Sequence, residues 1–573
     1  MNDSTLVDQL RSQATTRGGD QTDSDNTFLF SSETENPDHF FQGYFFHDAD
    51  YVFGEAGFDA FSRKRGVNRL VREDGCYVQM EKRNSSYRFS ADYSGYKKIF
   101  YFWDDGFWIV SNSLYQIVEC LRQNGYPVLP NISQLAAAAT EGTFYPSGRG
   151  SFFGQLTTFD TIVQGVRCAP MNGALWIGSS GVQIEKDELP HLGGDYRDHL
   201  TRFISTSAAR LQTLMRESFV QIACDLTGGL DSRVVFALLL SGIGDSGLGA
   251  DKRLQIRSST QPNARKDQAV AGKICAHLGL SLNGSLREKP KRLSGDSSYA
   301  LWRDLCLGVY YPIYFPYAAI SPGMIHLSGG GGENHRPFYG QFLGAPSAET
   351  FVASRTSNIA LRAARPDFEA ALHHAVDTIM DGAPRHLDVL ATHYRHFRNR
   401  FHTGREPQYT VALPLLASKL LDNCTAVAGE ARFRNAQMHY DILFNVKSEL
   451  LDFPFDKWRK CPSRVVHQSV TSIHGAVSMP AGACFIGNAP MTAGSRNKEP
   501  RAVDFLRAEF SRAKAGFAAD FLGSTYLRRA QRAVEAATHT NSFSGPVESK
   551  RVAVVLAAGM FKELNTPRKG YSC

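Results

Sequence analysis

The chain has 573 residues, 43% hydrophobic and 21% charged, with a formal net charge of +7, which predicts a globular protein of two or more domains. This mild charge permits an acidic small ligand but does not indicate a nucleic-acid partner. Ten scattered cysteines without a C-x-x-C pair argue against a zinc site or a disulfide scaffold. The sequence shows neither a signal peptide nor an apolar run of about 20 residues. We therefore expect a cytoplasmic protein without a membrane partner.

The first part of the chain predicts short antiparallel strands. Residues 1–27 are polar and predict a disordered tail. Asp74–Gly75 and Asp105–Gly106 predict hairpin turns, and apolar residues at helical spacing predict a helix over 114–124. β-rich segments between turns predict strands at 77–80, 86–90, 98–102, 107–111, 174–177 and 181–184. We therefore place a β-rich domain at residues 28–195.

The most informative stretch follows a hinge at Gly193–Gly194 and a helix expected over 195–215. An apolar strand at 220–226 leads into Thr227-Gly-Gly-Leu-Asp-Ser232, and a buried helix follows at 234–240. Two glycines allow close approach of the backbone, the first-turn N–H groups of the helix are unpaired, and the helix dipole favours negative charge. Thr227 and Ser232 add hydroxyl donors, and Asp231 is a candidate magnesium ligand. The stretch predicts a phosphate site, and it is not a Walker loop because no Gly-Lys-Ser/Thr follows.

The rest of the chain alternates strands with helices and then becomes helical. A strand at 254–257, a helix at 266–278 and a strand at 325–327 predict a parallel sheet with its ligand at the carboxyl ends of the strands. The third strand ends in Ser328-Gly-Gly-Gly-Gly-Glu333. Further helices are expected at 356–365, 367–380, 388–399, 502–515 and 526–538, and residues 475–500 predict a long loop or lid. The fold class is therefore α/β, with a second domain at residues 196–573.

Several of these motifs resemble those of the asparagine synthetase superfamily. Thr227–Ser232 resembles the Ser-Gly-Gly-x-Asp-Ser PP-loop of ATP pyrophosphatases, and Ser328–Glu333 is similar to the superfamily's Ser-Gly-Glu-Gly-Ser-Asp-Glu. Asp74-Gly-Cys-Tyr77 and Asp92-Tyr-Ser-Gly95 resemble Asp-Gly-x-Phe and Asp-x-x-Gly of its glutaminase-like domain. The resemblance covers most of the chain. It implies an Ntn-hydrolase-like β-rich sandwich, followed by a PP-loop parallel-sheet domain with a helical extension.

The start of the chain departs from the active family. That family has a cysteine directly after the initiator methionine, whose thiol attacks glutamine and whose amine acts as the base. This chain has Asn2, and an amide nitrogen is a poor nucleophile. The resemblance then implies a degenerate class II glutamine amidotransferase-like domain. We expect it to support the synthetase half through its apolar strands and to hydrolyse no glutamine.

The resemblance also assigns candidate site residues. Asp231 and Glu333 are expected to share a magnesium ion bound to ATP and to be catalytic, together with Lys447 and Lys457; Lys460 is a further candidate. Near Pro414, Thr410, Ala412 and Ala417 replace the family's Glu, Arg and Asp, with Arg405 and Glu406 as nearby substitutes. Leu254 and Asp267 are weaker nucleotide candidates, Asp267 also fitting a solvated helix residue. The nucleotide-binding set is Leu226, Thr227, Gly228, Gly229, Leu230, Asp231, Ser232, Ile256, Ser258, Ser328, Gly329 and Gly330.

The function implied is that of an ATP- and Mg²⁺-dependent carbon–nitrogen ligase. It adenylates a small-molecule or peptide carboxylate, releases pyrophosphate and lets an amine attack. Relatives without the glutaminase cysteine include β-lactam synthetases and lasso-peptide cyclases. Two alternatives stay open: a non-catalytic scaffold with this fold, and a PP-loop enzyme that modifies nucleic acid. A homodimer or a partner protein of the same pathway also stays open.

Overall fold

The computed structural model describes most of the chain. The described residues are 26–141, 151–186, 193–244, 252–261, 264–288, 292–318, 321–338, 347–384, 386–405, 411–457, 460–473, 479–487 and 501–561. The fold is mixed α/β, with several sheets and many helices, which confirms the predicted class. Residues 1–25 of the predicted tail, which include Asn2, and Glu406 lie outside the described residues. In the described part, no helix is long and apolar enough to cross a membrane.

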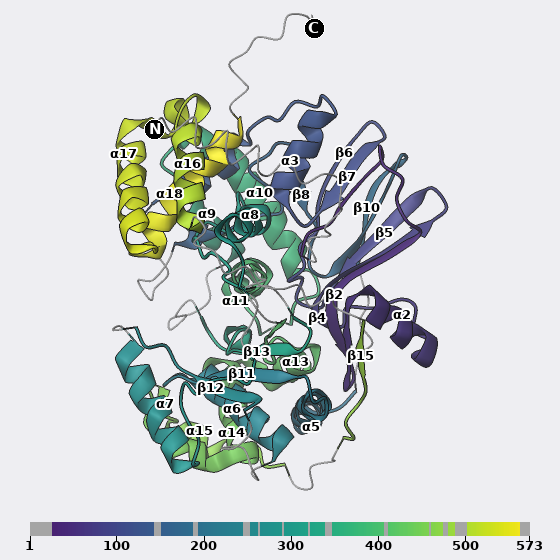
Figure 1. The fold of residues 1–573 in the computed structure, drawn as a ribbon, viewed down its shortest axis with the longest axis vertical. Coiled ribbons are helices and arrows are strands. Elements are labelled where there is room, and N and C mark those ends of the chain that lie inside the picture. The colour runs from purple at the N-terminus through teal and green to yellow at the C-terminus, as the bar shows by residue number, and fades with distance from the viewer. Residues whose placement is uncertain are drawn as a thin grey trace, which may run out of the picture.

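Two sheets of the N-terminal part pack face to face (Figure 1). The smaller has the order β1-β7-β6-β8, and the larger has the order β10-β9-β5-β4-β2-β3-β15. Alternate side chains of both sheets fill the space between them, among them Phe30, Met80, Phe89 and Val110. The strands are β1 (Leu29–Ser31), β2 (His39–His47), β3 (Asp50–Phe53), β4 (Asp74–Arg83), β5 (Ser86–Ala91), β6 (Phe100–Asp104), β7 (Phe107–Ser111), β8 (Arg167–Cys168), β9 (Gly173–Gly178), β10 (Gly181–Lys186) and β15 (Cys484–Ile486).

One of the two predicted hairpin turns is wrong. Asp105 and Gly106 have positive φ angles of 42° and 88° between β6 and β7, as the Asp-Gly turn requires. Asp74 and Gly75 instead begin β4 and pair with β2. A Cβ on Gly75 would lie 2.2 Å from the carbonyl oxygen of Tyr44. This glycine therefore permits close approach of two strands and not a turn.

The third sheet is parallel and lies in the lower half of the molecule in Figure 1. Its order is β12-β11-β13-β14, and each neighbouring pair is parallel. Ile222, Cys224, Ile325 and Leu327 are buried in one core with the apolar helix α6. The strands are β11 (Gln221–Asp225), β12 (Leu254–Arg257), β13 (Met324–Leu327) and β14 (Val411–Leu413), and the helices around them are α5 (Tyr196–Arg216), α6 (Leu230–Ile243), α7 (Arg265–His277), α13 (Lys419–Arg434), α14 (Gln437–Lys447) and α15 (Arg464–Gln468).

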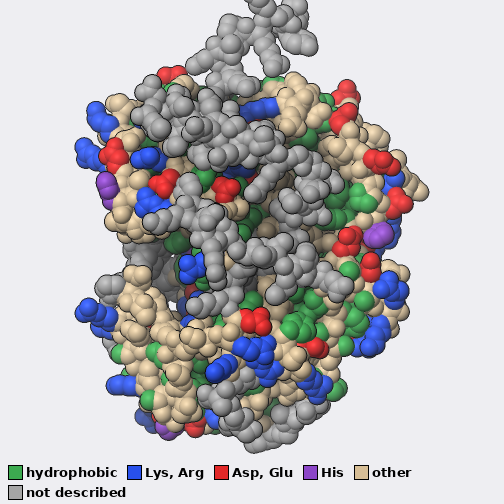
Figure 2. All heavy atoms as spheres, in the orientation of Figure 1, with side chains coloured by type: hydrophobic (Ala, Val, Ile, Leu, Met, Phe, Trp, Pro, Cys, Tyr) green, Lys and Arg blue, Asp and Glu red, His purple; other side chains and the backbone are tan. Residues whose placement is uncertain are grey.

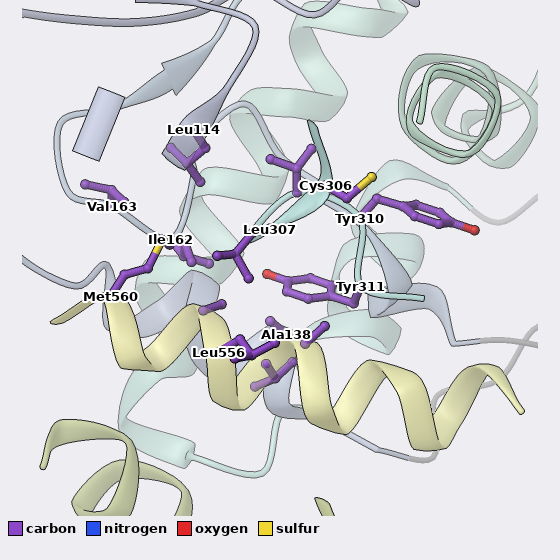
Figure 3. Packing of buried hydrophobic residues seen from close by; sticks show 14 of the residues in the cluster. Leu114, Ala138, Ile162, Val163, Cys306, Leu307, Tyr310, Tyr311, Leu556 and Met560 are labelled. Carbon is purple, nitrogen blue, oxygen red and sulfur yellow. The ribbon is translucent and has the colours of Figure 1, made fainter. Parts of the chain in front are cut away.

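The C-terminal helices share a core with the N-terminal part. Leu114 and Ile162 lie together with Leu307, Leu556 and Met560 in one buried cluster (Figure 3). The core therefore crosses the boundary expected at residue 195. The predicted helix over 356–365 is wrong, since α9 ends at 356 and α10 begins at 365. The remaining helices are α2 (Gly54–Arg65), α3 (Leu114–Gln123), α4 (Ile132–Ala139), α8 (Gly295–Cys306), α9 (Ala348–Thr356), α10 (Arg365–Met380), α11 (Val389–His393), the π-helical turn η5 (Tyr394–Asn399), α12 (Arg400–Thr403), α16 (Ala502–Ala513), α17 (Phe517–Thr540) and α18 (Pro546–Ala558).

A strand replaces part of the loop expected at 475–500. β15 adds to the sandwich beside β3, with Cys484 opposite Tyr51 and Phe485 opposite Val52 (Figure 1). Phe485 packs edge-on against Phe61 at 5.5 Å between ring centroids. A three-residue strand has too few residues for a period-2 pattern, so its pairing partner decides its structure. Residues 474–478 and 488–500 lie outside the described part.

The sandwich and the parallel-sheet part meet through buried charges as well as apolar strands. Tyr44 and Tyr51 pack in the same core as α5, as expected. Asp74 also accepts hydrogen bonds from Arg210 (2.7 Å), the Ser418 hydroxyl (2.8 Å) and the backbone N–H of Lys419 (2.8 Å). Burial opposes ionisation of Asp74, but the charges of Arg210 and Lys419 outweigh it and lower its pKa. The interface is therefore more ionic than the sequence suggests.

We expect the protein to lose stability in acid partly through His393. Its ring is fully buried, stacks on Phe397 at 4.6 Å and lies 3.0 Å from the Thr157 carbonyl oxygen through Nε2. Burial lowers the pKa of His393 to about 3 from its usual 6.5. Between these values the unfolded chain binds a proton that the native state does not, so stability falls as pH falls, by about 1.4 kcal/mol per pH unit.

The variant His393→Gln keeps a donor for Thr157 but cannot titrate. Thermal melting between about pH 7 and pH 4 should show a shallower loss of melting temperature for this variant than for the wild type. Parallel curves would contradict the assignment of a neutral buried imidazole.

Candidate functional site

The first loop joins the carboxyl end of β11 to the start of α6. The hydroxyls of Thr227 and Ser232 lie 2.8 Å apart, and Ser232 Oγ accepts the N–H of Thr227 at 3.1 Å. Thr227 Oγ1 accepts the N–H of Gly229, the residue that caps α6, at 3.0 Å. Leu226 and Leu230 are buried and anchor the loop in the core. The loop is thus fixed by its own hydroxyls, with the N-terminus of α6 at its end, which is the geometry of an anion site.

Two acidic residues from other segments contact this loop. The N–H of Gly228 donates to Asp267 of α7 at 2.9 Å. The carbonyl of Gly228 accepts the N–H of Asp456 at 3.0 Å. A Cβ on Gly228 would lie 2.8 Å from Asp456 Cβ, so only glycine allows this approach. Asp267 is therefore hydrogen-bonded to the loop and half-buried.

Of the three candidate lysines, Lys460 has a contact with the loop. Its Nζ is 2.7 Å from Asp456 and would be 3.6 Å from a Cβ on Gly229. Lys447 instead forms an ion pair with Glu449 at 3.2 Å at the end of α14, and Lys457 is exposed. Lys447 and Lys457 stay candidates, and the structure places the third candidate, Lys460, against the loop.

Arg233 of α6 holds the segment before Asp456 and Lys460 in place. Its buried guanidinium donates to the carbonyls of Leu450 (2.8 Å), Phe453 (3.0 Å) and Pro454 (2.8 Å). It also lies over the ring of Phe455, 3.8 Å from the centroid. These contacts hold the segment that carries Asp456 and Lys460 against the loop. Sequence reasoning missed Arg233, although it directly follows Ser232.

The second glycine run packs against the start of α6. A Cβ on Gly329 would lie 3.0 Å from the backbone nitrogen of Ser232, and one on Gly332 would lie 2.6 Å from Asp231 Cγ. Gly331 has a φ of 87° and sits against Ala417, whose nitrogen would be 2.6 Å from its Cβ. The structure therefore brings the two predicted loops into direct contact.

Arg336 and His439, which sequence reasoning missed, complete the surroundings of Asp231. Arg336 donates to Asp231 Oδ2 through Nη2 (2.6 Å) and to Oδ1 through Nε (3.2 Å). The same Nη2 is 3.5 Å from Glu333 Oε1. His439 Nε2 lies 3.1 Å from Asp231 Oδ1 without the alignment of a hydrogen bond. Only Arg336 has a signal in the sequence, because it follows Glu333 by three residues. It directly follows the short helical turn η3 (Gly332–His335).

These contacts separate the pKa values of the two acids. Burial opposes ionisation of Asp231, but Arg336 and His439 outweigh it and hold its pKa far below the usual range. Burial and the charge of Asp231 raise the pKa of Glu333. Burial opposes the charge on Arg336, yet Asp231 and Glu333 raise its pKa above the usual value. The arrangement is a buried Asp–Arg ion pair with a more easily protonated Glu beside it.

The acids as placed do not fit the expected magnesium ion. Magnesium requires oxygen ligands in near-octahedral geometry. Both oxygens of Asp231 are bonded to Arg336, and Glu333 faces the same guanidinium. Within the described ranges, no group of three or more His, Cys, Asp or Glu side chains is placed to hold a metal. As placed, Asp231 and Glu333 therefore face an arginine at the position where a shared metal was expected.

The three nucleotide candidates on β12 and directly after it differ in their burial and in their free polar groups. The side chain of Ile256 is buried in the core. Ser258 donates its N–H to Asn283 at 2.9 Å, and its buried hydroxyl has no partner among the described residues. Leu254 is half-buried. Ser258 is therefore the one of these three that keeps a polar group available.

The remaining candidates are Ser328, Arg405 and Thr410. Ser328 Oγ accepts the N–H of Gly330 at 3.3 Å. The guanidinium of Arg405 lies over the ring of Tyr314, 5.2 Å from the centroid. Thr410 lies outside the described residues. On the face drawn in Figure 2, the surface is hollowed between the helical part and the parallel-sheet part, and basic side chains are visible inside.

A polar bridge crosses the carboxyl ends of three strands. Asp225 of β11 lies 2.7 Å from His326 of β13 and 3.3 Å from Arg257 of β12. Sequence reasoning missed it because the three residues become neighbours only through the parallel register.

Neither a scan against protein-family models nor a search of curated proteins finds a match for this chain.

Proposed function

We propose that the protein is an ATP-dependent ligase that forms amide bonds by adenylating a carboxylate. The observation that carries the proposal is the loop of Thr227–Ser232 at the N-terminus of α6, with Lys460 beside it. Unpaired helix N–H groups and a lysine both favour a polyphosphate. The close packing of the second glycine run against Asp231 makes this a two-loop site.

In the proposed reaction, a carboxylate oxygen of the substrate attacks the α-phosphorus of ATP, and pyrophosphate leaves. An amine nitrogen then attacks the acyl carbon, AMP leaves, and the amine loses a proton. In this proposal, Lys460 and the N–H groups of the first turn of α6 stabilise the negative charge of the departing pyrophosphate. ATP brings its magnesium ion, if any, as part of the substrate, since Asp231 is bonded to Arg336.

The family proposal is an asparagine-synthetase-like protein. Three features support it: the two-sheet sandwich, the parallel sheet that follows it, and the glycine motifs after β11 and β13. In this proposal the sandwich is an Ntn-hydrolase-like domain that supports the synthetase part. The amine comes from a small-molecule or peptide substrate, or from a separate amine, and not from glutamine hydrolysed by this chain.

The test is pyrophosphate release from ATP with panels of carboxylates and amines. Asp231→Ala should remove most of the release, because Arg336 loses its partner and the loop loses its support. In parallel, glutamine labelled at its side-chain nitrogen should yield no stoichiometric glutamate. Unchanged release by Asp231→Ala would contradict the site, and labelled product would contradict the proposed nitrogen source.

One observation favours a non-catalytic scaffold as the second candidate. Asp231 is already neutralised by Arg336, and alanines stand at 412 and 417, where the resembling family has charged residues. A scaffold would bind ATP without releasing pyrophosphate from any panel. Turnover with even one carboxylate and amine pair would exclude it.

A further inference from the structure

We propose that Arg336 is the fixed cation of this site and binds the phosphates of the nucleotide, in place of a metal ion shared by Asp231 and Glu333. The inference rests on the proposed function for the identity of the ligand. It assigns new roles to three residues: Arg336 binds phosphate, and Asp231 and Glu333 position Arg336.

The position of Arg336 follows from its partner. Asp231 is the second residue of α6, so a guanidinium bonded to its carboxylate lies at the N-terminal end of that helix. This is where the helix N–H groups attract phosphate. Gly329 and Gly332 leave the space that the Asp231 side chain, the partner of Arg336, occupies, since a Cβ on Gly332 would lie 2.6 Å from Asp231 Oδ1. Arg336 is therefore built into the loop contact.

The guanidinium also has donors left for a ligand. Arginine presents five N–H bonds in a planar fork that suits phosphate. Nε and Nη2 are directed at Asp231, whereas Nη1 donates to none of the residues that the structure describes. The side chain is 24% exposed, so this remaining edge is reachable from solvent.

A shared metal would require this arrangement to be dismantled. Magnesium between Asp231 and Glu333 needs carboxylate oxygens of which those of Asp231 now accept hydrogen bonds from Arg336, while Glu333 pairs with the same guanidinium. Displacing the arginine would leave a largely buried guanidinium without its partner. A metal and Arg336 are thus alternatives at one position, and removal of the arginine should uncover the metal site.

The test compares wild type with Arg336→Met and Arg336→Met/Asp231→Asn. Manganese, which substitutes for magnesium at oxygen ligands, is titrated into each protein without nucleotide and followed by electron paramagnetic resonance. Wild type should bind no manganese at this site, Arg336→Met should gain one site, and the double variant should lose it. A stoichiometric site in wild type that Asp231→Asn removes would overturn the inference.

A second measurement tests the phosphate contact. Isothermal titration with ATP and magnesium should show at least about tenfold weaker binding for Arg336→Met, and equal affinity would overturn the assigned role. Arg336→Lys keeps the charge without the fork and should bind ATP with intermediate affinity, which separates the contact from a folding defect.

The matched control is Arg65→Met. Arg65 makes the same two-pronged contact with Asp50, at 2.7 and 3.0 Å, between α2 and β3 of the sandwich, and its loss should change neither manganese nor ATP binding. If wild type binds no ATP at all, the proposed function fails. The manganese titration then still decides whether Arg336 excludes a metal.

Discussion

Lys460→Met is expected to slow pyrophosphate release by at least about 100-fold, the usual effect of removing one preorganised charge from a transition state. Lys460 lies beside Gly229, and its Nζ is held 2.7 Å from Asp456. Its positive charge is therefore directed to the loop where pyrophosphate would leave. Methionine keeps the length and apolar stem of the side chain, so the change isolates the charge.

The same substitution at Lys457 is the comparison. Lys457 is three residues earlier and exposed, so Lys457→Met should change the rate by less than about twofold, as surface substitutions usually do. Both rates are measured in the pyrophosphate assay at saturating ATP, after melting curves show that each variant is folded. Equal rates for the two variants would remove Lys460 from the site.

Gly332→Ala is expected to abolish measurable ATP binding. The added Cβ would lie 2.6 Å from both Asp231 Cγ and Oδ1 and 2.8 Å from Asp231 Cβ, separations that atoms do not adopt. Because Asp231 belongs to the first turn of α6, it cannot move without also moving Arg336 or the helix end. The substitution therefore displaces the ion pair that organises both loops.

Gly330→Ala is the matched control within the same glycine run. The nearest atoms to its Cβ would be Ser328 Oγ at 3.3 Å, Thr403 Cγ2 at 3.6 Å and Pro414 Cβ at 3.7 Å. The hydroxyl can rotate, so the substitution should be tolerated. Isothermal titration with ATP should therefore detect binding by Gly330→Ala and none by Gly332→Ala. Normal binding by Gly332→Ala would show that the two loops are not in contact in solution.

Local patterns predicted many elements closely. The strands expected at 107–111 and 254–257 are β7 and β12 with the same bounds, and the helix expected at 114–124 is α3. These segments have clear apolar periodicity, or a buried run next to turn residues, so short-range preference and burial agree. Strand–helix alternation likewise predicted the parallel pairing of β11 with β12 and β13.

Other elements depend on neighbours that are distant in sequence. Asp74–Gly75 has turn residues but forms part of a strand, because Gly75 lies against the Tyr44 carbonyl and Asp74 bonds Arg210. β15 has only three residues and exists because β3 offers a free edge. In both cases the deciding contact joins residues far apart along the chain, which no local pattern contains.

The candidate site divides in the same way. The sequence by itself determined the two glycine loops, the helix that follows the first loop and the proximity of Asp231 to Glu333, because strand ends of a parallel sheet share one edge. Only the tertiary structure decided that Lys460 faces the loop and that Arg336 binds Asp231. A side chain's direction depends on how its segment is packed, here by Arg233 and the carbonyls it holds. The cation beside the acids was therefore expected as a metal and found as an arginine.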